Sequence, residues 1–281
     1  MFRPTTLIDL ADSYTNSRDI SSLYAATIKN HASKYATFLG SPDLETCLNY
    51  DAANNFLAWM DGQVKRRTLK SYRASIITLW RFAVSVSLAN PPDPSRIILR
   101  RIDWNPPECY VIDEIKALIS TAQAMRGWMH DRTRRSHYWE AAIRVGWETG
   151  LRRGDVWRVD SQRLRGPILA TVSNKSRQLT VHELTDETVA ALRRLDRRPT
   201  TLHWPHRGSA FEYWFARLVA DSGVCRGTFK WLRRASGSYV EQACPGMGSR
   251  HLGHTNAATF RKHYDARLIA QPGTLPTVPR I

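Results

Sequence analysis

The chain has 281 residues, of which 42% are hydrophobic, so it can bury a core in one large domain or two ordinary ones. No apolar run of about 18 residues could cross a membrane, and we expect no signal peptide. The net charge of +16 favours a polyanionic partner such as nucleic acid, although a basic protein can also simply be well solvated. The 4 cysteines form no CxxC pair, which suits reduced thiols in a cytoplasmic protein.

The first part of the chain is predicted to be helical. Residues 1–20 are expected to form a loose leader with one short helical turn, and residues 21–90 a helical domain. Gly40-Ser41-Pro42 ends a helix, and Tyr50–Met60 is predicted to form another. Thr68–Leu88 has the clearest amphipathic pattern. The apolar face of that segment carries Leu69, Tyr72, Ile76, Leu79, Trp80, Ala83 and Val84.

A proline cluster follows this helical region. Pro91-Pro92-Asp93-Pro94 removes backbone donors and favours extended backbone, which predicts a linker over residues 91–108. Asp93 is the only acid between Val64 and Arg101, so the start of the preceding helix and the linker are strongly basic. Such cations either contact DNA phosphates or form a solvated face. The residues predicted to bind DNA are Lys65, Arg66, Arg67, Lys70, Arg73, Arg100 and Arg101.

The remainder is predicted to be a mixed domain over residues 109–270, followed by an extended tail over residues 271–281. Within Pro167–Leu184, two β-branched runs separated by a polar break predict a β-hairpin. Helices are predicted over Asp113–Met125, Tyr138–Gly150, Thr188–Leu195 and Glu212–Asp221, and again from Phe229 onward.

The segment Glu148–Val156 is a candidate anion site. Gly150 ends one helix and Arg152 stands at the start of the next, where backbone N–H groups and a guanidinium can bind an anion together. Asp155 is placed to hold that guanidinium in one orientation. A surface salt bridge at a helix cap is the simpler alternative.

Other candidate residues follow at intervals. Lys175 lies at the predicted hairpin tip, where a lysine is either solvated or able to donate a proton to a leaving oxygen. Lys230 and Arg233 are three residues apart and share a helix face. His254 ends a Leu-Gly-His segment. Tyr264 lies in a polar run, where it is either a reactive group or a partly exposed helix tyrosine.

In this order, the segments resemble the tyrosine recombinase (phage integrase) family, over about residues 110 to 267. The family has an arginine in a TGLR segment, a hairpin lysine, an H-x-L-R box, an LGH box and a tyrosine about ten residues later. The catalytic residues that the resemblance implies are Arg152, Lys175, Lys230, Arg233, His254 and the nucleophile Tyr264, with Asp155 supporting. The chain departs from the pattern at Lys230, where the family has histidine, and has one more residue than usual between His254 and Tyr264.

The resemblance implies a mainly α fold with a small β-sheet, in which a helical core-binding domain and a catalytic domain form a C-shaped clamp on DNA. It also implies a site-specific recombinase (integrase) that cleaves and rejoins double-stranded DNA through a 3′-phosphotyrosyl intermediate. No metal or other cofactor is expected. The expected partners are a homo-tetramer on DNA and accessory DNA-bending proteins, with no membrane involved. Such enzymes serve mobile elements such as phages, transposons and integrons, or chromosome maintenance, and the expected location is the cytoplasm, on the nucleoid.

Alternative functions remain open. A DNA-binding protein of the same fold that no longer cleaves would explain Lys230, because lysine cannot move protons near neutral pH unless its pKa is strongly lowered. A DNA-relaxing enzyme similar to type IB topoisomerases would use similar residues. A metal-dependent nuclease is disfavoured because no carboxylates are paired for two metals. Cys244, His251 and His254 match no standard zinc spacing.

Overall fold

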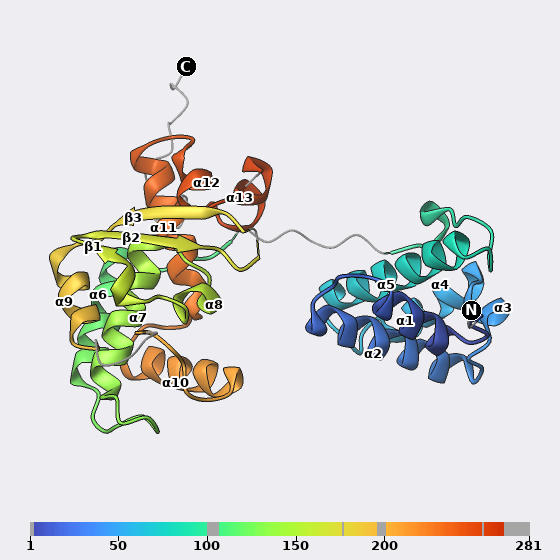
Figure 1. The fold of residues 1–281 in the computed structure, drawn as a ribbon, viewed down its shortest axis with the longest axis horizontal. Helices are drawn as coiled ribbons and strands as arrows, with labels where there is room; N and C mark the ends of the chain where they lie inside the picture. The colour runs from blue at the N-terminus through green and yellow to red at the C-terminus, as the bar shows by residue number, and fades with distance from the viewer. Residues whose placement is uncertain (1–2, 100–106, 176, 196–200, 255, 267–281) are drawn as a thin grey trace, which may run out of the picture. The chain divides into compact units, whose positions relative to one another are not determined.

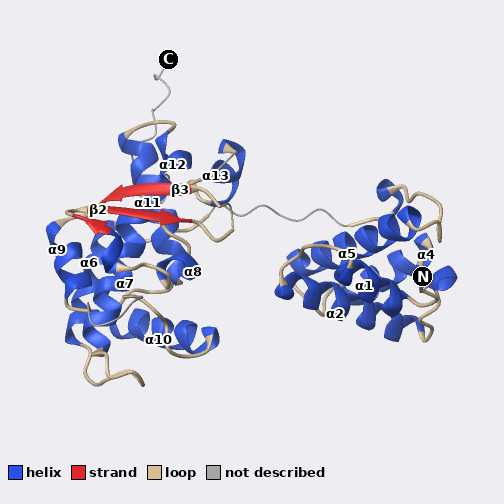
Figure 2. Ribbon diagram, viewed as in Figure 1, coloured by secondary structure: helices blue, strands red, loops and turns tan. Residues whose placement is uncertain are grey.

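A computed structural model describes residues 3–99, 107–175, 177–195, 201–254 and 256–266, and the chain divides into two compact units, Met1–Trp104 and Asn105–Ile281 (Figure 1). Each unit has its own hydrophobic core. Helices dominate, and the second unit also holds a small antiparallel sheet (Figure 2). The predicted mainly helical fold with a small sheet is therefore confirmed. Within the described residues, no helix is long and apolar enough to cross a membrane.

The first unit is a helical domain. Its elements are α1 (Leu7–Asn16), α2 (Ser22–Leu39), α3 (Leu44–Cys47), α4 (Tyr50–Met60), α5 (Arg66–Ser85) and the short 3-10 helix η1 (Pro94–Arg96). Gly40 ends α2 in the left-handed conformation, with φ of 68°. The face of α5 predicted to be apolar is buried against α1, α2 and α4, apart from Val84, which is half-buried.

The segment expected as a loose leader is instead the regular helix α1. Thr6 accepts a hydrogen bond from the backbone N–H of Asp9, and the Asp9 side chain accepts one from the N–H of Thr6. This capping box starts the helix, and Leu7 and Leu10 are then buried in the core of the first unit. The expectation of a loose leader was wrong because Thr6 and Asp9 cap this segment at its start and make it a regular helix.

Residues 91–99 pack on the first unit rather than forming a free linker. Arg73 on α5 donates to the carbonyls of Pro94 at 2.5 Å and Ile97 at 2.7 Å, and Ile97 is buried. The guanidinium of Arg96 lies 4.0 Å from the ring centroid of Tyr50. The prolines therefore shape a segment that closes the helical core, and the linker predicted over 91–108 does not begin at Pro91.

The second unit is built around a buried helix. Its helices are α6 (Ile112–Ala124), α7 (Arg135–Thr149), α8 (Arg153–Val156), η2 (Ser161–Arg163), α9 (Asp186–Arg193), α10 (Gly208–Asp221), α11 (Phe229–Ala243), α12 (Met247–His251) and α13 (Ala257–His263). Helix α7 contacts α6, α9 and α11, and its side chains are buried on nearly every face. Trp139 on α7 packs among the rings of Trp204, Phe211 and Phe215. This core makes a rigid base for the loops at the C-terminal end of α7.

The sheet has the antiparallel order β1 (Leu164–Arg165), β2 (Ile168–Val172), β3 (Leu179–Glu183). Strands β2 and β3 form the predicted hairpin, while β1 was not predicted because its two residues are too short to show alternation. Leu169 lies opposite His182, and both side chains are buried. The residues predicted as an extended tail, 271–281, lie outside the described part of the chain.

Candidate active site

The ends of several elements in the second unit bring the predicted site residues together. Arg152 immediately precedes α8, Arg233 lies within α11, His254 follows α12 and Tyr264 follows α13. Segments about a hundred residues apart in the sequence therefore converge at the C-terminal end of α7. Arg233 contacts both His254 and Tyr264, so these three side chains form one cluster.

Arg233 is the buried centre of this cluster, with 4% of its surface exposed. Its guanidinium donates to the carbonyl oxygens of Gly150 and Leu252, the latter at 2.8 Å. Burial, and then the charge of Arg152, lower the pKa of Arg233 to about 10. The side chain therefore stays cationic at neutral pH and is held in one orientation by two backbone segments.

Gly150 is required where the TGLR segment meets this arginine. It ends α7 in the left-handed conformation, with φ of 59°. A Cβ at this position would lie 2.4 Å from Leu252 Cδ2 and 3.1 Å from Ser236 Oγ. Because glycine lets the chain turn here, its carbonyl can reach Arg233.

His254 is neutral at pH 7 and has a defined tautomer. Burial, followed by the charges of Arg233, Arg152 and His263, lowers its pKa to about 4. Its Nε2 lies 3.0 Å from Nη2 of Arg233, and since a guanidinium only donates, Nε2 must be the acceptor. The proton is then on Nδ1, which is buried and has no partner within the described residues.

The ring of Tyr264 lies among cations. Arg233 Cζ is 5.0 Å and Lys230 Nζ 5.4 Å from its centroid, and the His254 ring centroid is 4.6 Å away. Burial raises the pKa of Tyr264, but the charges of Arg233, Lys230 and Arg152 and a hydrogen bond from Arg233 together outweigh it. The pKa of Tyr264 therefore falls below its ordinary value of 10, which favours the phenolate.

Ser238 on α11 holds the backbone beside Tyr264. Its hydroxyl donates to the carbonyl of Tyr264 at 2.9 Å and accepts from the N–H of Ala266 at 2.8 Å. Ser238 is fully buried, so these bonds tie the segment that carries Tyr264 to the helix that carries Arg233. Sequence reasoning missed this residue, because a serine in a small-residue run of a helix shows no signal for such a role.

Arg152 is the more accessible arginine, with 29% of its side chain exposed. Its Nη1 donates to Ser173 Oγ at 3.1 Å, and Ser173 Oγ lies 3.4 Å from Asp155 Oδ2. Asp155 Oδ1 accepts from the backbone N–H of Asn174 at 2.9 Å, while Asp155 Oδ2 is 4.0 Å from Arg152 Nη1. Asp155 therefore contacts Arg152 directly and through Ser173, and it also holds the β2–β3 turn. Its role in orienting the arginine stays a prediction.

Lys175 stands next to this network on the β2–β3 turn. The turn is closed by bonds between Ser173 N–H and the Gln178 carbonyl and between Arg177 N–H and the Ser173 carbonyl, both 2.9 Å long. The Lys175 side chain is exposed. The structure therefore anchors the base of this turn beside Arg152 and places the lysine at its exposed tip, without a contact to the Arg233 cluster.

A buried histidine pair behind Arg233 was not predicted. His182 on β3 and His251 on α12 have ring centroids 5.3 Å apart, and His251 Nε2 lies 2.7 Å from Ser236 Oγ. Ser236 belongs to α11, so the pair joins the sheet to the helices of the site. No group of three or more His, Cys, Asp or Glu residues in the described ranges is placed to hold a metal ion, including Cys244, His251 and His254.

This histidine pair predicts acid sensitivity. Burial, followed by neighbouring positive charge, lowers the pKa of both His182 and His251 from 6.5 to about 4. Since the unfolded chain binds these protons first, the stabilisation is complete above pH 6.5 and is lost as the pH falls toward 4. We expect the free energy of unfolding from urea titrations to fall by roughly 2–5 kcal/mol over this window.

Removing one ring should reduce that loss. His182→Leu should show a clearly smaller fall in the free energy of unfolding across the same window. The matched control is His203→Leu, because His203 is exposed and should leave the wild-type pH dependence unchanged. An equally steep fall in His182→Leu and in wild type would contradict the assignment.

The predicted DNA-binding residues fall into different environments. Lys65, Arg66, Arg67 and Lys70 are exposed around the start of α5. Arg73 donates to the carbonyl oxygens of Pro94 and Ile97, which gives it a structural role, and its DNA contact stays a prediction. The remaining two, Arg100 and Arg101, lie outside the described residues.

Comparison with known proteins identifies the fold. No protein-family model and no curated protein matches the sequence. A lambda integrase tetramer bound to a Holliday junction matches 91% of this chain and 76% of its own at 17% identity, with a TM-score of 0.72. The Tn1549 transposon integrase, in complex with a circular intermediate DNA, matches 92% of this chain and 95% of its own at 14% identity, with a TM-score of 0.71. XerH recombinase bound to difH substrate matches 95% and 83% at 16% identity, with a TM-score of 0.68. The resemblance seen in the sequence is thus confirmed as a shared fold.

Proposed function

This chain has the fold of the tyrosine recombinases, and we propose that it is a site-specific recombinase that cleaves and rejoins double-stranded DNA. The observation that carries the proposal is the position of Tyr264 beside Arg233, Lys230 and His254, with its pKa lowered. A nucleophilic phenol and cations for a phosphate lie in one place, which is what transesterification at a phosphodiester requires.

In the proposed reaction, the Tyr264 oxygen loses its proton and attacks the scissile phosphorus. A bond forms between phosphorus and the tyrosine oxygen while the bond from phosphorus to the 5′ oxygen breaks. The product is a 3′-phosphotyrosyl link and a 5′-hydroxyl, and attack by the 5′-hydroxyl of a partner strand reverses the chemistry. Because the covalent link conserves the phosphodiester energy, no ATP is needed.

The arginines are assigned to the non-bridging oxygens. Arg233 is fixed by the carbonyls of Gly150 and Leu252, and Arg152 is fixed through Ser173, so both guanidinium groups are oriented before DNA binds. Pre-oriented donors stabilise developing charge without having to reorganise during the reaction. Lys230 and the Nδ1–H of His254 would add further donors to the phosphate.

Lys175 is assigned as the general acid. The leaving 5′ oxygen needs a proton, and an exposed lysine on a turn anchored by Asp155 can reach the DNA from beside Arg152. This role depends on the position of the turn rather than on a contact present in the free protein. The scheme requires no metal or other cofactor.

The first unit is proposed to bind the DNA backbone through the start of α5. Lys65, Arg66, Arg67 and Lys70 surround a helix N-terminus that has no acid in its first turn and no side-chain cap. Cations at the positive end of a helix dipole are unfavourable by themselves, and a polyanion compensates for this. We infer that the two units together clamp a DNA duplex. We also infer that four copies of the chain assemble on two DNA sites with accessory DNA-bending proteins, and that the recombinase serves a mobile element.

The test is trapping on a nicked suicide duplex. The target site is first isolated by enriching DNA that the protein binds, from the DNA that flanks its gene and from random sequences. Wild-type protein is then incubated with a nicked duplex of this site in the presence of EDTA. We expect a protease-sensitive protein–DNA adduct, with the DNA attached at Tyr264 by peptide mass spectrometry. Tight DNA binding without an adduct would instead support the non-cleaving alternative, and relaxation of plasmids without recombinants would support a topoisomerase-like activity.

Lys230 is predicted to assist ionisation of Tyr264. Because its charge lowers the pKa of Tyr264, Lys230→Met should raise that pKa and slow adduct formation at neutral pH by roughly tenfold, with recovery at higher pH. The pKa of Tyr264 is measured from tyrosinate absorbance as a function of pH, as the difference between a protein that has Tyr264 and the same protein with Tyr264→Phe. Lys116→Met is the control, since Lys116 is an exposed lysine of α6 whose ammonium lies 3.5 Å from Asp113. An unchanged titration in Lys230→Met would refute the role.

A further inference from the structure

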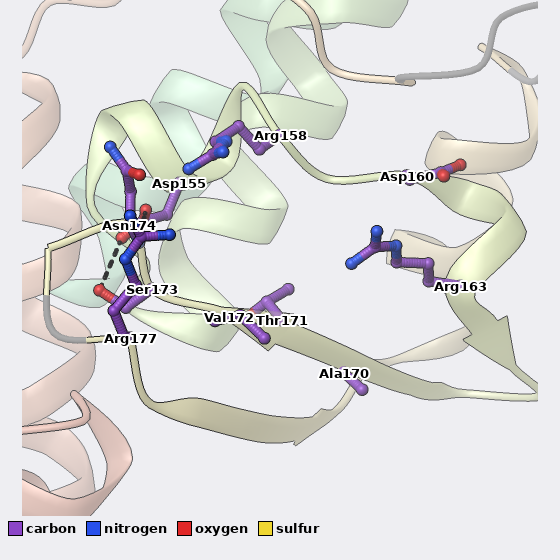
Figure 3. Close-up of a pocket in the computed structure, with 10 residues that line it drawn as sticks. All are labelled: Asp155, Arg158, Asp160, Arg163, Ala170, Thr171, Val172, Ser173, Asn174 and Arg177. Atoms are coloured by element: carbon purple, nitrogen blue, oxygen red, sulfur yellow. Dashed lines mark hydrogen bonds between the residues drawn. The ribbon is translucent and has the colours of Figure 1, made fainter.

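A hollow of about 350 Å³ beside β2 is lined by Arg158, Arg163 and Arg177, none of which has a role in the scheme above (Figure 3). The arginines come from different segments: Arg158 follows α8, Arg163 ends η2 and Arg177 lies on the β2–β3 turn. Ala170 and Val172 on β2 also line the hollow. Three guanidinium groups separated in sequence therefore surround one open space.

The positive charges that line this hollow outnumber the negative ones. All three arginines are exposed, and none forms an ion pair with a carboxylate among the described residues. The acids in the lining have other partners: Asp155 accepts from Asn174 N–H at 2.9 Å, and Asp160 accepts from Gln162 N–H at 3.0 Å. With three arginines against two aspartates, the lining keeps an excess of positive charge, and a bound anion would compensate for it.

The hollow adjoins the proposed active site. Ser173 and Asp155 line it, and the same Ser173 hydroxyl receives the hydrogen bond from Arg152. In Figure 3, Arg158 and Arg177 lie at the end that holds Asn174, and Arg163 lies nearer Asp160 at the other end. An anion held by Arg158 and Arg177 would therefore be separated from the Arg152 site only by the Ser173–Asp155 bridge.

We propose that this hollow, the arginine hollow, binds a second phosphodiester of the same DNA, close to the one that is cleaved. This inference rests on the proposed function. The arginines would hold the non-bridging oxygens, and the short apolar side chains of Ala170 and Val172 would contact the adjoining deoxyribose. A contact that spans the β2–β3 turn would also order Lys175, because Arg177 and Lys175 belong to the same turn.

The test is a methylphosphonate scan of the target duplex, in which each backbone phosphate near the cleavage point is made neutral in turn. Binding is measured in a Tyr264→Phe background, with and without the double change Arg158→Ala and Arg177→Ala. We expect that neutralising at least one phosphate other than the scissile one weakens DNA binding roughly tenfold when both arginines are present. The same neutralisation should not change DNA binding by the double variant.

The control is Arg193→Ala, which removes an exposed arginine of α9 outside the arginine hollow and should respond as the parent does at every linkage. If the double variant shows the same change in DNA binding as the parent at every neutralised linkage, the inference is overturned. That result would mean that the arginine hollow either stays empty on DNA or binds an acidic protein segment. Since binding is measured without cleavage, failure of the proposed chemistry would show itself separately, as the absence of an adduct in wild type.

Discussion

Tyr264→Phe is expected to abolish the covalent protein–DNA adduct while leaving DNA affinity within about twofold, because phenylalanine keeps the ring and removes only the attacking oxygen. The ring would still pack against His254 and beneath Arg233. The segment should also stay in place, since Ser238 binds its backbone rather than the phenol. Single-turnover trapping on the nicked duplex measures the adduct, and a gel-shift titration measures the affinity.

The matched control is Tyr239→Phe. Tyr239 is on α11 and its ring packs against Trp147, 5.5 Å between centroids, so it is a tyrosine of the same unit outside the cluster. Its variant should form the adduct at the wild-type rate. Adduct formation by Tyr264→Phe would mean that another residue is the nucleophile, and the proposed function would then lose its central observation.

Arg233→Lys is expected to slow adduct formation by about 100-fold to 1000-fold, the range seen when one pre-oriented donor to a developing anion is lost. The positive charge survives, but an ammonium cannot bind the Gly150 and Leu252 carbonyls, His254 Nε2 and a phosphate oxygen together. The loss should appear in the cleavage step, with DNA affinity reduced much less. It is measured as the adduct rate at saturating DNA.

A folding defect must be separated from this catalytic one, because buried carbonyls left without donors cost about 1–3 kcal/mol. Urea unfolding of Arg233→Lys gives that cost directly, and the adduct rate is compared at temperatures where the variant remains folded. The control is Arg234→Lys, one position along α11, where the guanidinium donates to the Glu108 carbonyl at 3.0 Å. A near-wild-type rate of adduct formation for Arg233→Lys would refute the proposal that the guanidinium of Arg233 binds several acceptors and the phosphate at once.

Local signals in the sequence were sufficient for most helices and for the hairpin. Tyr50–Met60 was predicted with the bounds that α4 has, because Asp61-Gly62 marks its end in the sequence. The structure adds that the Asn49 side chain caps its start. The β2–β3 hairpin was predicted from two β-branched runs and a polar break. Residues with these signals need no distant partner to be recognised.

The ordered segments around Arg152, Arg233, His254 and Tyr264 also allowed the fold to be inferred from sequence, although the assignment of their roles remains a proposal. What could not be predicted depends on contacts between distant parts of the chain. Ser173 and Ser238 are ordinary serines until folding places one against Arg152 and the other against the Tyr264 backbone. The pairing of His182 with His251 likewise spans two elements.

The cationic residues show the same division. Counting charges predicted a polyanion as partner, but it did not separate Arg73, which fastens the segment after α5, from the exposed lysines and arginines at the start of that helix. It also gave no reason to group Arg158, Arg163 and Arg177, which only the packing of η2 and the turn beside β2 brings around one hollow. Sequence by itself determined most of the helices and the hairpin, because those depend on local periodicity, and its net charge predicted a polyanionic partner. Which side chains meet, and which cations remain without a partner, was decided by tertiary structure, because hydrogen bonds and ion pairs depend on distances in space that sequence separation does not specify.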